Sequence, residues 1–183
     1  MAAKRYVALL RAINVGGRNR VPMTDLRAAF EADGHRAVKT HLQSGNVIFE
    51  TDAPRDALED DLETLLERTF GFAVPVVVRS HAQMRNVVTK APPGFGARPE
   101  EFHSDALFLK APLTAKRVMG MVQLREGVDQ AWPGSGVVYF ARLSEQRTKS
   151  RMGSIVGTPE YKQMTIRSWK TTTKLLDLLE PDR

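Results

Sequence analysis

Apolar and polar positions along the first 80 residues predict strands and helices in a regular order. Four apolar, β-branched runs are typical of strands, and the first is nearly continuous, as expected for a strand buried on both faces. These predicted strands cover residues 6–15, 36–42, 47–49 and 74–78. Two segments between them, from Pro22 to Gly34 and from Pro54 to Gly71, space their apolar residues as amphipathic helices do. The predicted order is β-α-β-β-α-β, which is that of a ferredoxin-like unit.

The second half of the chain repeats this order of predicted elements. Apolar runs predict strands at 105–109, 127–132, 137–141 and 164–167. Helical spacing covers 115–122, a short helix is expected at 150–156, and Ser168 is a good N-cap for a helix over 169–179. We therefore expect an α+β fold, a tandem duplication of ferredoxin-like (βαββαβ) units plus a C-terminal helix. The duplication rests on element order, since the halves share no residue-level identity.

A Pro/Gly-rich segment at 91–99 is the best candidate for a linker between the two predicted units. The predicted domains are residues 1–79 as ferredoxin-like unit one, 80–101 as a connecting segment, and 102–183 as unit two with the C-terminal helix.

The expected topology brings together segments that are far apart in the sequence. Right-handed β-α-β crossovers make the first two strands of a unit parallel, so their C-terminal ends lie at the same edge of the sheet. In the first unit this places residues 14–17 beside the turn at 43–46. In the second unit the third and fourth strands are parallel, which places the loop 142–149 beside residues 167–168.

Composition narrows the class of protein. The 183 residues are 42% hydrophobic and 26% charged, which is typical of a globular domain. The absence of cysteine excludes disulfides and cysteine-bound metals, and the four histidines have no ligand spacing, so we predict no metal and no cofactor. No apolar stretch reaches the length of a membrane span and the N-terminus has no secretory pattern. We expect a cytoplasmic protein with no membrane partner.

The net charge of +6 is a mild bias, but the basic residues are unevenly distributed. Residues 1–20 contain five basic and no acidic residues, and residues 142–174 contain eight basic residues against two acidic ones. Acid-poor segments of this kind favour a phosphate-bearing partner, either nucleic acid or a nucleotide.

Both basic segments contain candidate anion-binding residues. In the first, Gly16-Gly17 precedes a predicted helix, where glycines allow close approach and free N–H groups attract an anion. The alternative is a tight turn at these glycines with solvated arginines. In the second, Lys170 and Lys174 repel each other on one helix face, which a bound anion would explain. The candidate anion-binding residues are Arg11, Asn14, Gly16, Gly17, Arg18, Arg167, Lys170 and Lys174.

A candidate polar pocket lies beside the glycine loop and consists of Gln43, Ser44 and Asn46. The simpler interpretation of this segment is a hairpin turn, since Gly and Asn tolerate left-handed conformations. Ser44 is a poor candidate nucleophile, because no histidine has a recognisable spacing and there is no GxSxG motif.

Aromatic residues give two further alternatives. Tyr6 and Phe49 lie on the predicted central strands, where RNA-recognition domains place stacking rings, but the expected cover on both sheet faces argues against that function. Trp169 can stack on a base or pack in the core, and its spacing with Leu176 favours the core.

Three segments, VALLRAINVGGRNRVPMTDLR, THLQSGNVIF and IRSWKTTTKLLDLL, resemble the bacterial family called domain of unknown function 1697. The resemblance covers nearly the whole chain. It implies a duplicated ferredoxin-like α+β protein, and it brings no established function and no catalytic residue. It implies importance for Arg11, Asn14, Gly16, Gly17, Met23, Leu26, Arg27, Gln43, Ser44, Gly45, Asn46, Arg167, Trp169, Thr172 and Lys174.

The leading hypothesis from the sequence is that the protein binds a phosphate-bearing ligand, nucleic acid or a nucleotide, through its basic loops. This hypothesis favours a binding or regulatory protein over an enzyme. One alternative is an enzyme that acts on a small anionic substrate in the polar pocket. The other is a protein-interaction module in which the motifs are structural. The sequence leaves the oligomeric state open.

Overall fold

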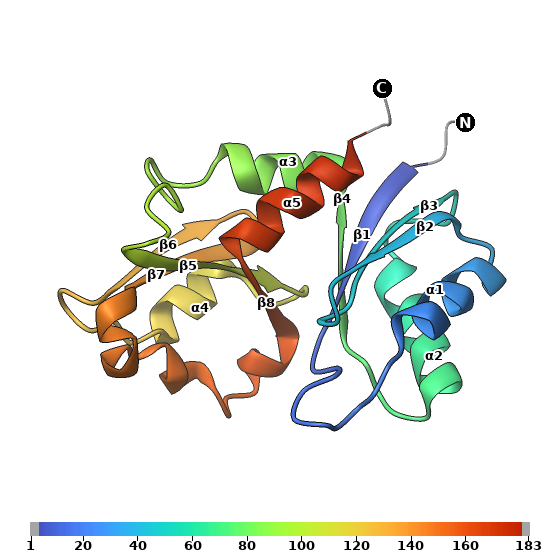
Figure 1. Ribbon diagram of the computed structural model, residues 1–183, viewed down its shortest axis with the longest axis horizontal. Coiled ribbons are helices and arrows are strands. Elements are labelled where there is room, and N and C mark those ends of the chain that lie inside the picture. The colour runs from blue at the N-terminus through green and yellow to red at the C-terminus, as the bar shows by residue number, and fades with distance from the viewer. Residues whose placement is uncertain (1–3, 181–183) are drawn as a thin grey trace. The chain divides into compact units, whose positions relative to one another are not determined.

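The computed structural model describes residues 4–180, which form two compact units, each with one four-stranded antiparallel sheet. Unit 1 contains the residues up to Met84 and those from Leu175 onward, and unit 2 contains Arg85–Lys174. The fold is mixed α+β, as the sequence predicts, and Figure 1 shows the helices that accompany each sheet. No helix of the described residues is long and apolar enough to cross a bilayer.

Unit 1 has the strand order β2-β3-β1-β4, with every neighbouring pair antiparallel. Its strands are β1 (Lys4–Leu10), β2 (Arg36–His41), β3 (Asn46–Thr51) and β4 (Val76–Ser80). Its helices are α1 (Met23–Ala32) and α2 (Leu58–Phe70), with the first part of α3 (His81–Thr89) and the last part of α5 (Trp169–Leu179). As predicted, Gly71 ends α2, because its φ of 81° is a left-handed conformation that suits glycine.

The core of unit 1 lies between the sheet and the helices α1 and α2, which cover the same face (Figure 1). Tyr6 and Phe49 are buried in this core, with their ring centroids 5.9 Å apart. Val7 and Leu9, which point to the opposite face of β1, are fully buried as well. Both faces of β1 are therefore covered, as predicted, and Tyr6 and Phe49 form no open surface for stacking bases.

The first strand is shorter than predicted, because the chain leaves the sheet after Leu10. Ala12 and Asn14 have φ values of 59° and 53°, which no strand adopts. Ile13 is buried, but as part of a loop. The predicted extension of the strand to residue 15 is wrong, because apolar character alone does not distinguish a buried loop from a buried strand.

Unit 2 has the strand order β6-β7-β5-β8, again antiparallel throughout. Its strands are β5 (Phe102–Leu109), β6 (Asp129–Gly134), β7 (Val137–Leu143) and β8 (Met164–Ser168). Its helix α4 (Ala115–Met121) packs against one face of the sheet. Helix α5 begins after Ser168, and the Ser168 hydroxyl accepts a hydrogen bond from the N–H of Thr171 at 3.2 Å, as the predicted N-cap requires. The short helix expected at 150–156 is a 3-10 helix, Met152–Ile155, and two further 3-10 turns, Ser144–Lys149 and Glu160–Gln163, complete the connection from β7 to β8.

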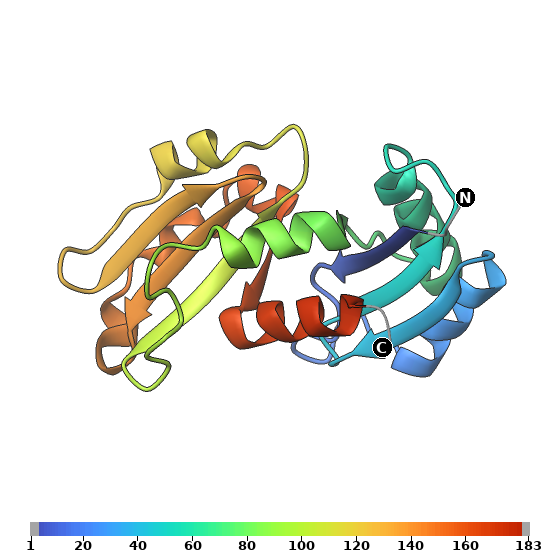
Figure 2. The ribbon, with the colours of Figure 1, turned by 90° about the horizontal axis from the view of Figure 1, so that it is seen from above.

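The two faces of the second sheet differ in cover. One face buries Leu107, Val138 and Phe140 against α4 and the 3-10 turns. The other face is covered by α3, α5 and the loop that follows α3, as Figures 1 and 2 show from two directions. Strand alternation brings the side chains of Phe102 and Ser104 to this second face.

Candidate functional site

The glycine loop and the hairpin turn of unit 1 meet, as the predicted topology requires. The side-chain amide of Asn14 donates to the carbonyl oxygens of Gln43 at 2.8 Å and Val21 at 3.0 Å, and its Oδ1 accepts the N–H of Val21 at 2.8 Å. Asn14 is therefore a structural link between the two segments. Gly16 and Gly17 lie in a turn closed by the N–H of Arg18 and the carbonyl of Val15 at 3.0 Å.

The candidate polar pocket uses its polar atoms to build the hairpin turn. Asn46 is buried, and its Nδ2 donates to the carbonyl of His41 at 2.7 Å and to the hydroxyl of Ser44 at 3.2 Å. Gln43 is exposed. These bonds favour the turn interpretation. A ligand at these residues, or at the exposed Arg18 and the half-buried Arg11, stays a prediction.

The basic residues of the second segment have different surroundings. Arg167 is 6% exposed, and its guanidinium donates to Thr165 Oγ1 at 2.7 Å and to the Ile166 carbonyl at 2.9 Å. Burial lowers the pKa of Arg167 to about 10. Lys170 and Lys174 are exposed on α5, and neither forms an ion pair with another described residue. Arg167 thus contributes to the interior of unit 2, while the two lysines are accessible.

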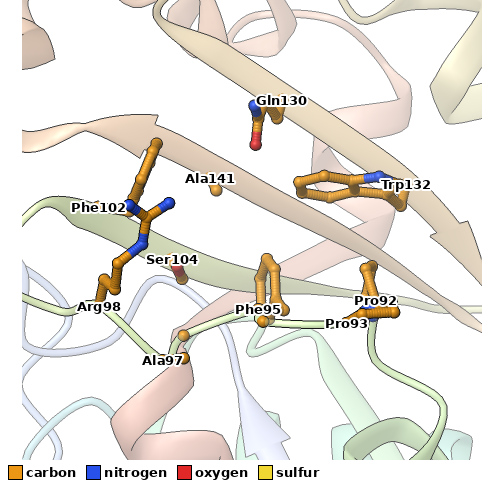
Figure 3. Close-up of a pocket in the computed structure, with 12 residues that line it drawn as sticks. Pro92, Pro93, Phe95, Ala97, Arg98, Phe102, Ser104, Gln130, Trp132 and Ala141 are labelled. Carbon is orange, nitrogen blue, oxygen red and sulfur yellow. The ribbon is translucent and has the colours of Figure 1, made fainter.

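An aromatic cavity of about 290 Å³ lies on the second sheet face of unit 2. It is lined by Pro92, Pro93, Gly94, Phe95, Gly96, Ala97, Arg98, Phe102, Ser104, Gln130, Trp132 and Ala141. In Figure 3, Phe102 and Arg98 lie on one side and Trp132 on the other, with Ala141 and Ser104 between them. The small side chains leave a slot between larger rings.

Phe95 holds the loop wall of this cavity. Its ring makes edge contacts with Trp169, Tyr139 and Trp132, with centroid distances of 4.9, 5.3 and 5.9 Å. Gly96 has a φ of 73°, and a Cβ there would overlap the indole of Trp169. Trp169 is therefore packed, as its spacing favours, and the wall is formed before any ligand arrives.

A second cavity of about 250 Å³, here named the α5 cavity, adjoins the aromatic one, because both are lined by Gly96, Phe102 and Ser104. Its other lining residues are Pro99, His103, Ser168, Trp169 and Lys170. Ser104 is 8% exposed, and its buried hydroxyl has no hydrogen-bond partner among the residues that the structure describes. A buried hydroxyl without a partner is uncommon and costs free energy. An incoming polar group at the junction of the two cavities would satisfy it.

Comparison with known proteins places the chain in a family. The model of a family described as "Protein of unknown function (DUF1697)" matches residues 3–139. The chain belongs to the DUF1697 family. Among solved structures, the conserved bacterial protein SP0830 from Streptococcus pneumoniae is 26% identical, with a TM-score of 0.86 over 98% of this chain and 100% of that one.

The other comparisons add little to this DUF1697 assignment. An unknown protein from Galdieria sulphuraria is 11% identical over 91% of this chain and 97% of that one, but its TM-score of 0.27 carries no argument. No curated protein matches the sequence. The DUF1697 match includes the aromatic cavity residues from Pro92 to Trp132, and it ends before Ala141 and Lys170.

Sequence reasoning placed none of the aromatic cavity residues of this DUF1697 protein in a site. Phe95 lies in the segment predicted as a linker, and the predicted strand began at residue 105, which left Phe102 and Ser104 outside it. The sequence signal that could have indicated this site is a phenylalanine inside a Pro/Gly cluster, because an aromatic ring in a loop needs apolar side chains to pack against.

Proposed function

We propose that unit 2 binds a nucleotide, with the base in the aromatic cavity and the phosphate in the α5 cavity. The observation that carries the proposal is the buried, unpartnered hydroxyl of Ser104 at the junction of the two cavities. A ribose or phosphate oxygen placed there would give this hydroxyl a partner.

The aromatic cavity suits a planar ring. Its volume of about 290 Å³ is at the lower end for small-molecule sites, and Phe95, Phe102 and Trp132 supply apolar surface. Stacking of one base on an aromatic ring contributes about 1–3 kcal/mol. The amide of Gln130 can both donate to and accept from the edge of the ring.

The α5 cavity suits a phosphate. It includes Ser168, Trp169 and Lys170 at the start of an 11-residue helix, where the positive end of the helix dipole attracts an anion. Lys170 adds a positive charge that no described carboxylate neutralises. A nucleotide ligand also agrees with the basic composition and the cytoplasmic location expected from the sequence.

Titration calorimetry with nucleoside monophosphates, the matching nucleosides and inorganic phosphate tests the proposal. We expect a monophosphate to bind more tightly than either part alone. Trp132→Leu should weaken both the nucleotide and the nucleoside, whereas Lys170→Gln should weaken only the nucleotide. Lys174→Gln is the matched control, because this lysine is exposed on the same helix and does not line the cavity.

Absence of saturable binding by every nucleotide would overturn the proposal, and so would equal effects of the two lysine variants. Binding only of oligonucleotides would assign this face to nucleic acid instead of a mononucleotide.

We also infer that the two units are tandem ferredoxin-like units. Their strand orders correspond position by position, with the first and third strands of each unit in the centre of its sheet. The second unit differs by having 3-10 turns where the second crossover helix is expected.

A further inference from the structure

The connection from β7 to β8 borders a third cavity in unit 2, here named the turn cavity, with a volume of about 340 Å³. In unit 1 the corresponding connection, from β3 to β4, is helix α2, which packs a row of leucine side chains into the core. In unit 2 the connection consists of 3-10 turns, and the turn cavity lies between them and the sheet. The cavity is lined by His103, Asp105, Arg142 and Ile166 from the strands and by Met152, Gly153, Ile155, Val156 and Tyr161 from the connection.

An acidic residue takes the place of an aromatic ring in the part of the sheet that borders this cavity. Tyr6 and Asp105 each lie four residues before the end of the first strand of their sheet, and each is paired with a phenylalanine of the neighbouring strand, Phe49 or Phe140. The ring of Tyr6 fills the core of unit 1, whereas Asp105, which is 5% exposed, places a carboxylate at the matching position of unit 2. A buried carboxylate is costly and fills less volume than a ring, so this position indicates a binding site more than a packed core.

The charged atoms at this end of the cavity have weak or distant partners. Nη1 of Arg142 lies 3.0 Å from the sulfur of Met152, its Nη2 lies 3.4 Å from Oδ2 of Asp105, and its buried Nε has no partner among residues 4–180. Oδ1 of Asp105 lies 3.3 Å from Nε2 of His103. All four residues line the turn cavity, so these contacts place the charged atoms in its wall. A guanidinium forms short, forked bonds to a carboxylate, and the terminal nitrogens of Arg142 are therefore suited to a better acceptor than a thioether.

The rest of the cavity wall is mainly apolar. Ile155 is buried, Ile166 and Tyr161 are partly buried, and Val156 is 60% exposed. A ligand that covers Val156 would remove apolar surface from water, which is favourable. The cavity therefore suits a molecule with one polar and one apolar end.

The charges around the polar end balance. Two carboxylates, Asp105 and Asp129, interact with two guanidinium groups, Arg142 and Arg147. Burial raises the pKa of Asp105, and the positive charges of His103, Arg142 and Arg147 oppose that rise. A ligand with a net charge would leave one buried charge without compensation, whereas a ligand with one positive and one negative group preserves the balance.

We propose that the turn cavity binds an apolar α-amino acid, with its ammonium group on Asp105, its carboxylate on Arg142 and its side chain against the apolar wall. An α-amino acid carries both charged groups on one carbon, which matches the adjacent positions of Asp105 and Arg142. The volume of about 340 Å³ lies within the range of about 300–1,000 Å³ for small-molecule sites. The site is independent of the proposed nucleotide site, because strand alternation puts Asp105 and Ser104 on opposite faces of the sheet.

Titration calorimetry on the full-length protein tests the proposal with leucine, methionine and phenylalanine, and with two analogues of leucine. Leucinamide lacks the carboxylate, and 4-methylpentanoate lacks the ammonium group. We expect saturable binding of at least one of the amino acids, and leucine to bind about tenfold or more tightly than either analogue, since each lost group removes a charged hydrogen bond. Absence of binding by all three amino acids overturns the proposal, and so does an analogue that binds as tightly as leucine.

Val156→Trp tests the position of the site without a change in the core. The residue is exposed and lines the cavity, so a larger side chain there should obstruct the entrance and lower amino-acid affinity about tenfold or more. Leu124→Trp is the matched control, because Leu124 is a partly exposed apolar residue of the same unit that lines none of the three cavities, and it should leave affinity unchanged. Equal affinities of the two variants would overturn the assignment to the turn cavity.

Asp105→Asn tests the recognition of the ammonium group. In a variant that still melts cooperatively, the tenfold preference for leucine over 4-methylpentanoate should fall to about one, because the charge that selects the ammonium group is gone. A folded variant that keeps the wild-type preference overturns the role of Asp105. If the variant does not fold, Val156→Trp and the two leucine analogues still decide the proposal. Nucleotide binding is measured separately on the other face, so the failure of either site leaves the other standing.

Discussion

Replacement of Ser104 by alanine should change stability and ligand affinity in opposite directions. The hydroxyl is buried and has no partner within residues 4–180, so the folded protein carries the cost of its desolvation without a compensating hydrogen bond. Such a cost is about 1–3 kcal/mol, part of which is recovered when the oxygen is removed, and the small void left behind offsets some of the gain. We expect Ser104→Ala to raise the free energy of unfolding by about 0.5–1 kcal/mol.

The same substitution should weaken nucleotide binding. A hydrogen bond to a charged group contributes about 1.5–3 kcal/mol, which corresponds to an affinity loss of about tenfold or more. Urea unfolding of the free protein measures the first effect, and calorimetry with a nucleoside monophosphate measures the second. Ser154→Ala is the control, because Ser154 is an exposed serine of the same unit outside the three cavities, and it should change neither quantity.

Two results would refute the reasoning about Ser104. A destabilisation above about 1 kcal/mol would mean that the hydroxyl has a partner in the folded protein. An unchanged affinity would mean that the hydroxyl does not face the ligand.

Three further predictions concern other parts of the chain. Asn14→Ala should destabilise unit 1 by about 3 kcal/mol, because it removes three hydrogen bonds and places alanine at a φ of 53°. Urea unfolding measures this loss of stability. The control Asn19→Ala should cost less, because it removes one side-chain hydrogen bond at a φ of 50°. Gly96→Ala should displace the loop wall, since its Cβ would overlap Trp169, and should reduce both the melting temperature and nucleotide affinity; equal affinity would contradict the packing argument. Burial raises the pKa of Asp129, but hydrogen bonds from Ser150 and from the backbone of Arg151 and Arg125 outweigh it and lower the pKa overall. Because the pKa of Asp129 is lower in the folded protein than in the unfolded one, the carboxylate stabilises the fold above its ordinary pKa of 3.8 and loses that contribution as the pH falls further. The difference in melting temperature between the wild type and Asp129→Asn should therefore shrink from pH 6 to about pH 2.5.

Elements with local signals could be predicted from the sequence. Ser168 caps α5 and Gly71 ends α2 as expected, because a cap depends on one residue and its immediate backbone. The boundaries that failed depended on distant neighbours. The apolar run through residue 15 contains a loop, because Ile13 is buried by the turn at Gly45, whose Cβ would lie 2.6 Å from the Ile13 side chain.

The meeting of the glycine loop with the hairpin turn was predictable although the two segments are far apart. The handedness of the crossover places the ends of the first two strands at one edge, and the bond from Asn14 to the Gln43 carbonyl joins them. What these residues do there depends on where their polar atoms point. The structure directs the amides of Asn14 and Asn46 to backbone carbonyls, which a motif cannot indicate.

The sequence by itself determined the α+β class and the membership of the family, because each follows from local periodicity or from recognisable segments. Only the tertiary structure decided the candidate site. Phe95, Phe102 and Trp132 come from a loop and two strands that are not sheet neighbours, and no spacing along the chain relates them. Two other features exist only after the sheet has formed: the Ser104 hydroxyl without a partner, and the contact of Asp105 with Arg142. Long-range strand pairing decides which residues come together and which polar atoms are left without a partner.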